Sequence, residues 1–528
     1  MRKLLIKVMC ILLVAGGLIV WSRTGPAVLA ASTALGLDDS AGYLAGRAGD
    51  PRALDVVEAS GAGMLRVPIP WDKVERSPGA FSWSYQDGQG SVDYPQFFSR
   101  LERRGIKPVA VLAGGPAYLS HLYPQQPVYQ DQLLEAWESY LRAVVGRLGD
   151  QVDIWQIGER INDPQSRGGM VFPGQADAEA PPDPVLYSEM LRRAYAIIKS
   201  ADAGDTVILG SLVFGGNCAF HPSAYLQALQ DLDAWYAFDA AGIALPELDH
   251  PLEQARLDEC GFTVAESSGY DAAGSLRFIA DLAGSKPLWV TGLGFSADLL
   301  AAESARRGTL PQVVEADLLT RASAMLLAYG QADQVFWSYH PPAGQPGIIA
   351  MQNLANLNTA LVNSNMQEGA VPPQDGFETL RFRGSGKLTL LAWRVNGGDE
   401  AVPLAIQGLE GYGVRAWSAD AASLKNKDGI PLQVDAGGSA ALLVSERPVI
   451  ISGRPSDIKQ SATQIVTDQV SMAQTGLKTR MDAWLEVQKA KAADNVGSWV
   501  AKQQQSLLDM LSASFQQWLR SSLGLAKQ

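Results

Sequence analysis

The stretch KPLWVTGLGFS, residues 286–296, contains a short apolar run bounded by residues that interrupt secondary structure. Pro287 precedes the run at residues 288–291, and Gly292 and Gly294 follow it. A run of this length with such boundaries is typical of a fully buried strand. We therefore expect a buried strand that ends at these glycines.

Similar runs recur between residues 33 and 365, with longer helical patterns between them. The strand candidates are Thr33–Leu37, Leu65–Ile69, Pro108–Leu112, Val152–Ile157, Thr206–Leu212, Phe238–Ala244, Leu288–Thr291 and Gln334–Ser338. Apolar residues recur at helical spacing in Asp131–Arg147 and Pro184–Ser200. Eight repeats of strand and helix predict an α/β fold, a (β/α)8 TIM barrel. An open doubly wound sheet is the alternative, but no Gly-rich phosphate loop follows the first strand.

The pattern changes near Pro372 and Pro373, after which short alternating runs follow one another without helices. They predict a small antiparallel β-sandwich over residues 371–454, and the barrel is then expected over residues 32–370. Residues 455–528 carry an apolar stripe at helical spacing, which predicts an amphipathic helical tail. The tail either packs on its own barrel or provides a surface for self-association or a protein partner.

The N-terminus has the features of an export signal. Basic residues precede the apolar run Val8–Val20, and small residues after it allow cleavage behind Ala30. Residues 1–31 are therefore expected to be a signal peptide. An uncleaved membrane anchor over residues 4–21 is the alternative. Either way we expect an extracytoplasmic protein that is secreted, periplasmic or at the cell surface, with membrane contact through residues 4–21 only.

Composition excludes several function classes. The 528 residues are 47% hydrophobic and 19% charged, which is ordinary for a globular protein. The formal net charge of -12, without a basic stripe, argues against a nucleic-acid partner. The four histidines are scattered without metal-ligand spacing, so neither a metal nor another cofactor is implied.

Two cysteines, Cys218 and Cys260, follow the N-terminal segment. A barrel would place them on loops after neighbouring strands, and an exported chain folds in an oxidising compartment. We therefore expect a disulfide between them. Two free buried thiols are the alternative.

The predicted strand ends carry a series of motifs. They read LRVPIPWDKVERSPGAFSW at 65–83, KPVAVLAGGPAYLS at 107–120 and VDIWQIGERIND at 152–163. In this order they resemble clan A of the glycoside hydrolases, especially families 39 and 5, over roughly residues 33 to 450. The resemblance implies a carbohydrate or polysaccharide ligand.

The same resemblance implies two catalytic positions. Glu159 matches the general acid/base, which protonates the leaving glycosidic oxygen. A second carboxylate roughly 5–5.5 Å away attacks the sugar in retaining enzymes. The family places it in a W-x-T-E-x-G setting, but residues 289–294 read WVTGLG, so that Gly292 stands where the nucleophile is expected. Glycine provides no nucleophile, which favours a pseudoenzyme.

Other residues near Glu159 also depart from the family pattern. Gly158 replaces an Asn that would bind a sugar hydroxyl, and Arg160 replaces a Pro. We expect glycine at 158 and at 292 to remove a side chain without forcing a new backbone shape. Glu247 or Asp249 could substitute for the missing carboxylate, because an inverting pair tolerates about 6.5–9.5 Å.

The resemblance also implies residues that bind the sugar. Aromatic faces stack on sugar rings while polar side chains fix their orientation. The candidates are Arg66, Trp71, Tyr118, Trp155 and Trp337. Trp337 resembles the Trp that ends the eighth strand and lies beneath the sugar in this clan. The alternative is that most of these aromatic residues fill the barrel.

Three functions are consistent with these observations. The expected one is an exported carbohydrate-binding pseudoenzyme. The second is a working glycosidase that pairs Glu159 with an unusual carboxylate. The third is a scaffold of an envelope or polysaccharide-export assembly that acts through its helical tail.

Overall fold

The computed structural model describes residues 34–453 except for a set of short gaps. These are 48, 51, 88–89, 123–126, 165–181, 216–217, 258–259, 261–270, 330–331, 340–347, 362–363, 367–375, 385–386, 399, 407–408, 410–413, 425–428 and 436–437. The expected signal segment 1–31 and helical tail 455–528 lie outside the described residues.

Nine parallel strands form the main sheet in the order β10-β11-β12-β13-β1-β2-β7-β8-β9. They are β1 Leu35–Asp38, β2 Met64–Pro70, β7 Lys107–Ala113, β8 Ile154–Ile157, β9 Thr206–Leu209, β10 Leu212–Val213, β11 Ala241–Leu248, β12 Leu288–Phe295 and β13 Ala332–Ser338. The sheet curls until its two ends meet. At the junction, the amide of Leu209 in β9 donates to the carbonyl of Ala240, beside β11, at 2.9 Å. All eight predicted strands are present, with the fifth divided into β9 and β10. The expectation that the seventh strand ends at Gly292 and Gly294 is wrong, because β12 continues through both glycines to Phe295.

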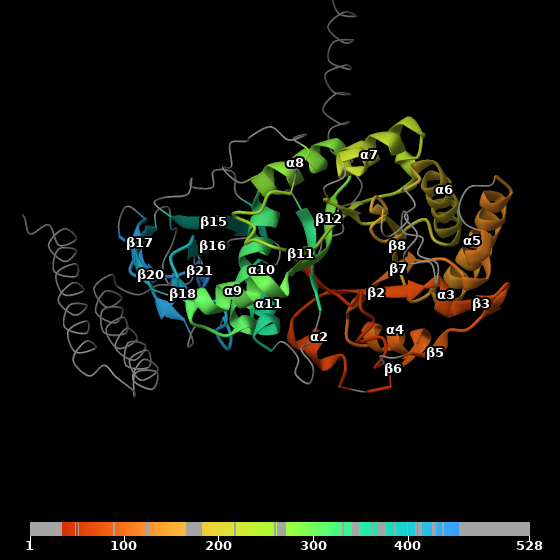
Figure 1. Cartoon of the computed structure of the whole chain (residues 1–528). Helices are drawn as coiled ribbons and strands as arrows, with labels where there is room; N and C mark the ends of the chain where they lie inside the picture. The colour runs from red at the N-terminus through yellow and green to blue at the C-terminus, as the bar shows by residue number, and fades with distance from the viewer. Residues whose placement is uncertain are drawn as a thin grey trace, which may run out of the picture.

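Helices cover the outside of the curled sheet (Figure 1). The main ones are α2 Asp55–Ala59, α4 Tyr94–Glu102, α5 Pro127–Leu148, α6 Pro184–Ala201, α7 Pro222–Asp231, α8 Asp271–Ala283, α9 Ala297–Arg307, α10 Pro311–Ala328 and α11 Ile348–Leu361. The two predicted helices fall within α5 and α6. Helix α6 begins where the Asp183 side chain accepts hydrogen bonds from the amides of Val185 and Leu186. Within the described ranges, no helix is both long and apolar enough to span a membrane.

The interior of the barrel is layered. Its lower layer is an apolar cluster of its own, made of Met64, Val109, Ile154, Ile208, Ala240, Trp289 and Phe336. Side chains alternate along a strand, so the inward position two residues after Ile154 is Gln156, and the one after Met64 is Arg66. These inward positions are polar and buried. The barrel therefore has an apolar floor below a polar layer at the C-terminal ends of its strands.

The predicted antiparallel sandwich follows the barrel. One sheet has six strands in the order β14-β15-β16-β21-β18-β19, and β17 pairs with β20. The strands are β14 Ser364–Met366, β15 Phe377–Gly384, β16 Lys387–Arg394, β17 Val402–Ile406, β18 Arg415–Ser418, β19 Ile430–Pro431, β20 Ala440–Val444 and β21 Val449–Gly453. Leu390, Leu404 and Ile451 belong to the buried cluster of the sandwich.

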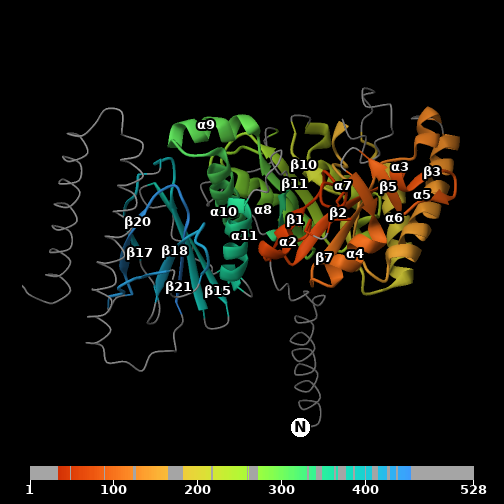
Figure 2. The same ribbon diagram turned by 90° about the horizontal axis from the view of Figure 1, so that it is seen from below.

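The sandwich packs on the barrel through a shared core. Leu391 and Trp393 of β16 belong to the same buried cluster as the barrel, and Figure 2 shows α10 and α11 between the two parts. Polar contacts cross the same boundary: Trp393 Nε1 donates to Glu253 at 2.8 Å, and the Tyr329 hydroxyl donates to Glu378 at 2.8 Å. The two parts therefore form one packed unit.

Cys218 and Cys260 form a disulfide with their Cα atoms 5.4 Å apart, and it closes a loop across 42 positions. The chain-entropy relation for such a loop gives about 4 kcal/mol as an upper value. We predict that the Cys218→Ser/Cys260→Ser variant loses about 2–4 kcal/mol in free energy of unfolding, measured by urea denaturation. Reductant should lower the stability of the native chain but not that of the variant; equal sensitivity of the two would contradict the prediction.

Candidate functional site

Arg66 is the centre of the polar layer at the C-terminal end of the barrel. Its side chain points inward from β2 and is 1% exposed. Nη1 donates to Asp38 Oδ1 at 2.6 Å, Nε donates to Gln156 Oε1 at 2.8 Å, and Nη2 donates to Glu159 Oε2. One guanidinium thus joins carboxylates from the ends of β1 and β8.

Glu159 is the second residue after β8, in the bend that follows this strand, and its side chain is 31% exposed. Its second oxygen accepts a hydrogen bond from Ser211 Oγ at 3.3 Å. Both carboxylate oxygens are therefore acceptors, as in an ionised group. A general acid must carry a proton that it can donate, so this arrangement suits an ion-paired carboxylate better than a proton donor.

Neutral side chains connect the rest of this layer. Gln156 Nε2 donates to Ser211 Oγ at 2.8 Å, and Thr291 Oγ1 donates to the same oxygen at 3.0 Å. We call Asp38, Arg66, Gln156, Glu159, Ser211 and Thr291 the mouth cluster. It draws on strands β1, β2, β8 and β12 and on the segments that follow β8 and β9.

Gly292 lies beside the mouth cluster, on β12. A Cβ atom at this position would lie 3.3 Å from Asp38 Oδ2 and 3.3 Å from Ser338 Oγ. Asp38 in turn contacts Arg66, which contacts Glu159. Through these contacts Gly292 lies in the same site as Glu159, and the carboxylate beside Gly292 is that of Asp38.

Sequence reasoning missed Asp38. The only signal in the sequence is the pair Asp38–Asp39 directly after the first predicted strand. Asp39 is also fully buried, and it accepts hydrogen bonds from the amides of Leu44 and Ala45 at 2.9–3.0 Å. Burial raises the pKa of Asp39 to about 7, while those amides act in the opposite direction. Asp39 thus fixes the loop that follows β1, and with it the position of Asp38.

The expectation that Gly158 leaves the backbone unchanged is wrong. Its φ is +89°, a region that side-chain-bearing residues rarely adopt, and a Cβ there would lie 2.8 Å from Ile161 Cγ2. Arg160 also has a positive φ of 51°, and it pairs with Asp163 at 2.7 Å. The chain beyond β8 therefore follows a path that requires glycine at 158.

Trp71 does not line the site, contrary to the sequence-based expectation. It is fully buried and stacks on Tyr140 with ring centroids 5.0 Å apart. Its Nε1 donates to Glu75 Oε2 at 2.6 Å. Trp71 belongs to the packing beneath α5 and cannot contact a ligand in this structure.

Trp155 and Trp337 are also fully buried and face away from the barrel interior. Trp155 Nε1 donates to Asp205 at 2.9 Å, and Trp337 Nε1 donates to Ser323 of α10 at 2.6 Å. The alternation along β8 and β13 explains both errors, because Gln156 and Ser338 occupy the inward positions instead. Arg66, at 1% exposure, is likewise shielded from direct contact with a sugar.

Tyr118 remains a candidate for ligand contact. It lies in the short 3-10 helix η1 (Ala117–Leu122) after β7 and is partly exposed. Partial burial and the nearby Glu75 carboxylate raise the pKa of its hydroxyl. Phe81 and Trp83, after β2, are partly exposed too and stack with ring centroids 6.1 Å apart. These three rings lie on segments that follow the C-terminal ends of strands.

Glu247 and Asp249 are exposed at the far end of β11. Among the described residues, no hydrogen bond or ion pair connects either of them to Glu159. Asp38, by contrast, is connected to Glu159 through the guanidinium of Arg66 that they share.

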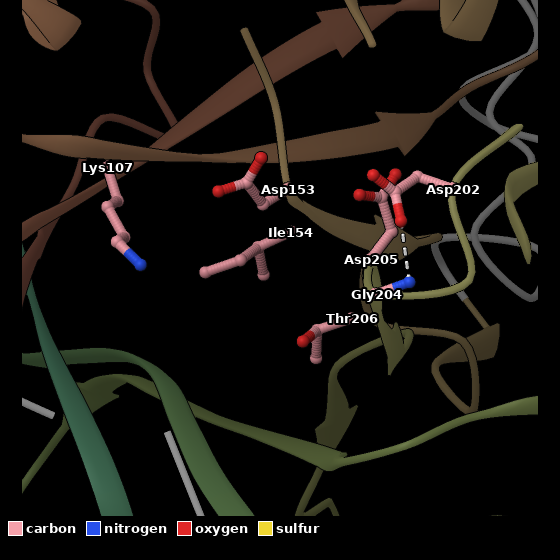
Figure 3. Close-up of a pocket in the computed structure, with 7 residues that line it drawn as sticks. All are labelled: Lys107, Asp153, Ile154, Asp202, Gly204, Asp205 and Thr206. Carbon is pink, nitrogen blue, oxygen red and sulfur yellow. Dashed lines mark hydrogen bonds between the residues drawn. The ribbon is translucent and has the colours of Figure 1, made fainter. Parts of the chain in front are cut away.

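The opposite end of the barrel contains a hollow of about 270 Å³ (Figure 3). It is lined by Lys107, Asp153, Ile154, Asp202, Gly204, Asp205 and Thr206. Burial raises the pKa of Asp205. Active sites of such barrels lie at the C-terminal ends of the strands, so we assign the candidate site to the mouth cluster.

Within the described part of the chain, no group of His, Cys, Asp and Glu side chains could hold a metal ion.

Comparison with solved structures identifies a shared fold. The chain is similar to a family 39 glycoside hydrolase from Bacteroides cellulosilyticus, with a TM-score of 0.56 and 16% identity over 81% of this chain and 82% of that one. It is also similar to CelM2, a bifunctional glucanase-xylanase from a metagenome library, with a TM-score of 0.51 and 9% identity over 76% and 94%. A family 30 xylanase from Clostridium acetobutylicum gives a TM-score of 0.50 and 14% identity over 80% and 96%.

Sequence comparison adds no closer relative. No family model matches the chain, and no curated protein matches it. At these identities the structural likeness establishes the fold alone, which is a TIM-barrel-like domain with a β-sandwich after it.

The ion pairs of Arg66 provide a test of the mouth cluster. Arg66→Met removes a buried cation and leaves Asp38, whose side chain is 3% exposed, without its counter-charge. We predict a loss of about 3–5 kcal/mol in free energy of unfolding, measured by urea denaturation. Arg142→Ala removes an exposed helical pair with Glu138 and should cost less than about 0.5 kcal/mol. Similar losses in the two variants would contradict this view of the site.

The backbone at Gly158 provides a second test. Gly158→Asn would place a Cβ against Ile161 at a positive φ, so we predict a loss of about 1–3 kcal/mol, measured by the same method. Gly146→Ala is the control, because it lies within α5 with open space around it and should stabilise by about 0.5–1 kcal/mol. A neutral Gly158→Asn would show that the bend tolerates a side chain.

Proposed function

We propose that this protein binds carbohydrate with a glycoside-hydrolase-like barrel and does not carry out retaining hydrolysis. The observation that carries the proposal is the state of position 292. Gly292 has no side chain there, and the carboxylate beside it, Asp38, is held by Arg66.

The chemistry of retaining hydrolysis requires two carboxyl groups with different roles. One donates a proton to the leaving oxygen, and the other attacks the sugar carbon. Glu159 accepts hydrogen bonds with both oxygens, and the Asp38 side chain is 3% exposed. Neither group is therefore arranged for its role, because Glu159 is ion-paired with Arg66 and the Asp38 side chain is buried away from a sugar.

Binding of a sugar requires only hydrogen-bonding groups and aromatic faces, and it needs no proton donor or nucleophile. A partly exposed carboxylate such as Glu159 can accept hydrogen bonds from sugar hydroxyls, and aromatic faces such as those of Tyr118 and Trp83 can stack on sugar rings. The likeness of the barrel to those of carbohydrate-active enzymes supports this ligand class.

We include in the proposal an extracytoplasmic location, which rests on the sequence of residues 1–31 alone.

Two other functions receive less support. A working hydrolase needs a partner for Glu159, and Glu247 is exposed without a contact to it among the described residues. A scaffold function would depend on residues 455–528, outside the described residues, and no contact of the described residues bears on it.

The test measures binding and turnover on the same protein. Full-length protein should bind one or more neutral oligosaccharides in a calorimetric panel and should release no product from aryl glycosides or polysaccharides. Tyr118→Ala should weaken binding about tenfold or more, the equivalent of one stacking contact. Tyr236→Ala is the matched control, because this 57% exposed ring precedes β11 at the opposite end of the barrel.

Glu159→Gln separates the proposal from the hydrolase alternative. Turnover by the native protein that Glu159→Gln abolishes would overturn the pseudoenzyme proposal. An absence of binding across the panel, with the fold intact, would overturn the carbohydrate-binding part.

A further inference from the structure

We infer that Asp38 has replaced the missing carboxylate at position 292 as the counter-charge of Arg66. On this view, a carboxylate at position 38 or a carboxylate at position 292 can balance the buried charge of Arg66. This chain has the carboxylate at position 38, on β1. Asp38 is then a positioning residue, which acts on Glu159 through Arg66. The inference rests on the part of the proposed function that treats position 292 as a vacated carboxylate site.

The first argument is the closeness of the two positions. A Cβ at 292 would already lie 3.3 Å from Asp38 Oδ2, and a glutamate side chain extends further into the same space. Two carboxylates on side chains whose attachment points lie this close together, in a buried site, oppose each other's ionisation. The Asp38 carboxylate is therefore incompatible with an ionised glutamate at 292.

The second argument is the charge of the mouth cluster. It contains one cation, Arg66, and two carboxylates, Asp38 and Glu159, while Gln156, Ser211 and Thr291 are neutral. A further carboxylate at 292 would add a second uncompensated negative charge. Loss of Asp38 would instead leave Arg66 with Glu159 as its remaining carboxylate partner in the cluster.

The third argument is geometric. Asp38 and Gln156 hold Nη1 and Nε of Arg66 at 2.6 and 2.8 Å, which fixes the plane of the guanidinium. Nη2 is then directed at Glu159. Because a guanidinium is planar and rigid, the position of Asp38 determines where Glu159 is held.

The experiment is a double-mutant cycle with neutral controls, read as the thermal unfolding midpoint of the full-length protein. The variants are Asp38→Asn, Gly292→Glu, Gly292→Gln and the two combinations of Asp38→Asn with a change at 292. We expect Asp38→Asn and Gly292→Glu each to lower the midpoint by several degrees. We expect Asp38→Asn/Gly292→Glu to unfold at a higher temperature than Asp38→Asn alone.

The Gln variants separate charge from volume. Asp38→Asn/Gly292→Gln should show no such rescue, because glutamine has the size of glutamate without its charge. Equal midpoints for the two combined variants would overturn the inference. A purely structural role for Asp38 predicts that equality, since it requires no carboxylate at 292.

One comparison remains informative even if the Asp38→Asn variant does not fold. In the presence of native Asp38, Gly292→Glu should unfold at a clearly lower temperature than Gly292→Gln, and equal midpoints would contradict the inference. These readouts require no sugar. Turnover by the native protein would overturn the proposed function and leave the stability comparison to decide the role of Asp38 separately.

Discussion

The arrangement of the site depends on one buried guanidinium. Arg66 brings a full positive charge into the barrel, and removing such a charge from water is favourable only when well-placed partners surround it. Asp38, Gln156 and Glu159 are these partners, and they come from strands that lie on both sides of β2. The C-terminal ends of β1, β2 and β8 are thus held in register by electrostatics as well as by the sheet.

The layering of the barrel makes this possible. An apolar floor that includes Ile154, Trp289 and Phe336 excludes water from below, which strengthens every polar contact above it. The polar layer is satisfied internally, with Ser211 Oγ receiving bonds from Gln156 and Thr291. The interior of the barrel therefore holds a buried cation between two carboxylates and leaves one negative charge in excess, near the partly exposed Glu159.

The strands could be predicted from the sequence, because a buried strand is marked locally by an apolar run and by the Gly and Pro residues that bound it. The sequence also predicted that Glu159 and Gly292 would share a site, because parallel strands end on the same face of a barrel. It failed for Trp155 and Trp337 because a loose motif does not determine which side of a strand a residue faces. It missed Asp38 because the contact that gives this residue its role joins positions 38 and 66, which only the folded chain brings together.

The shared core of the barrel and the sandwich has a consequence for how the chain can be divided. Trp393 and Leu391 complete packing that begins in the barrel, and Glu253 receives both Arg321 of α10 and Trp393. A fragment cut at the barrel boundary would expose this surface to water and would remove the Trp393 indole that donates to Glu253. Any change that removes the sandwich therefore also requires new surface residues on α10 and its neighbours.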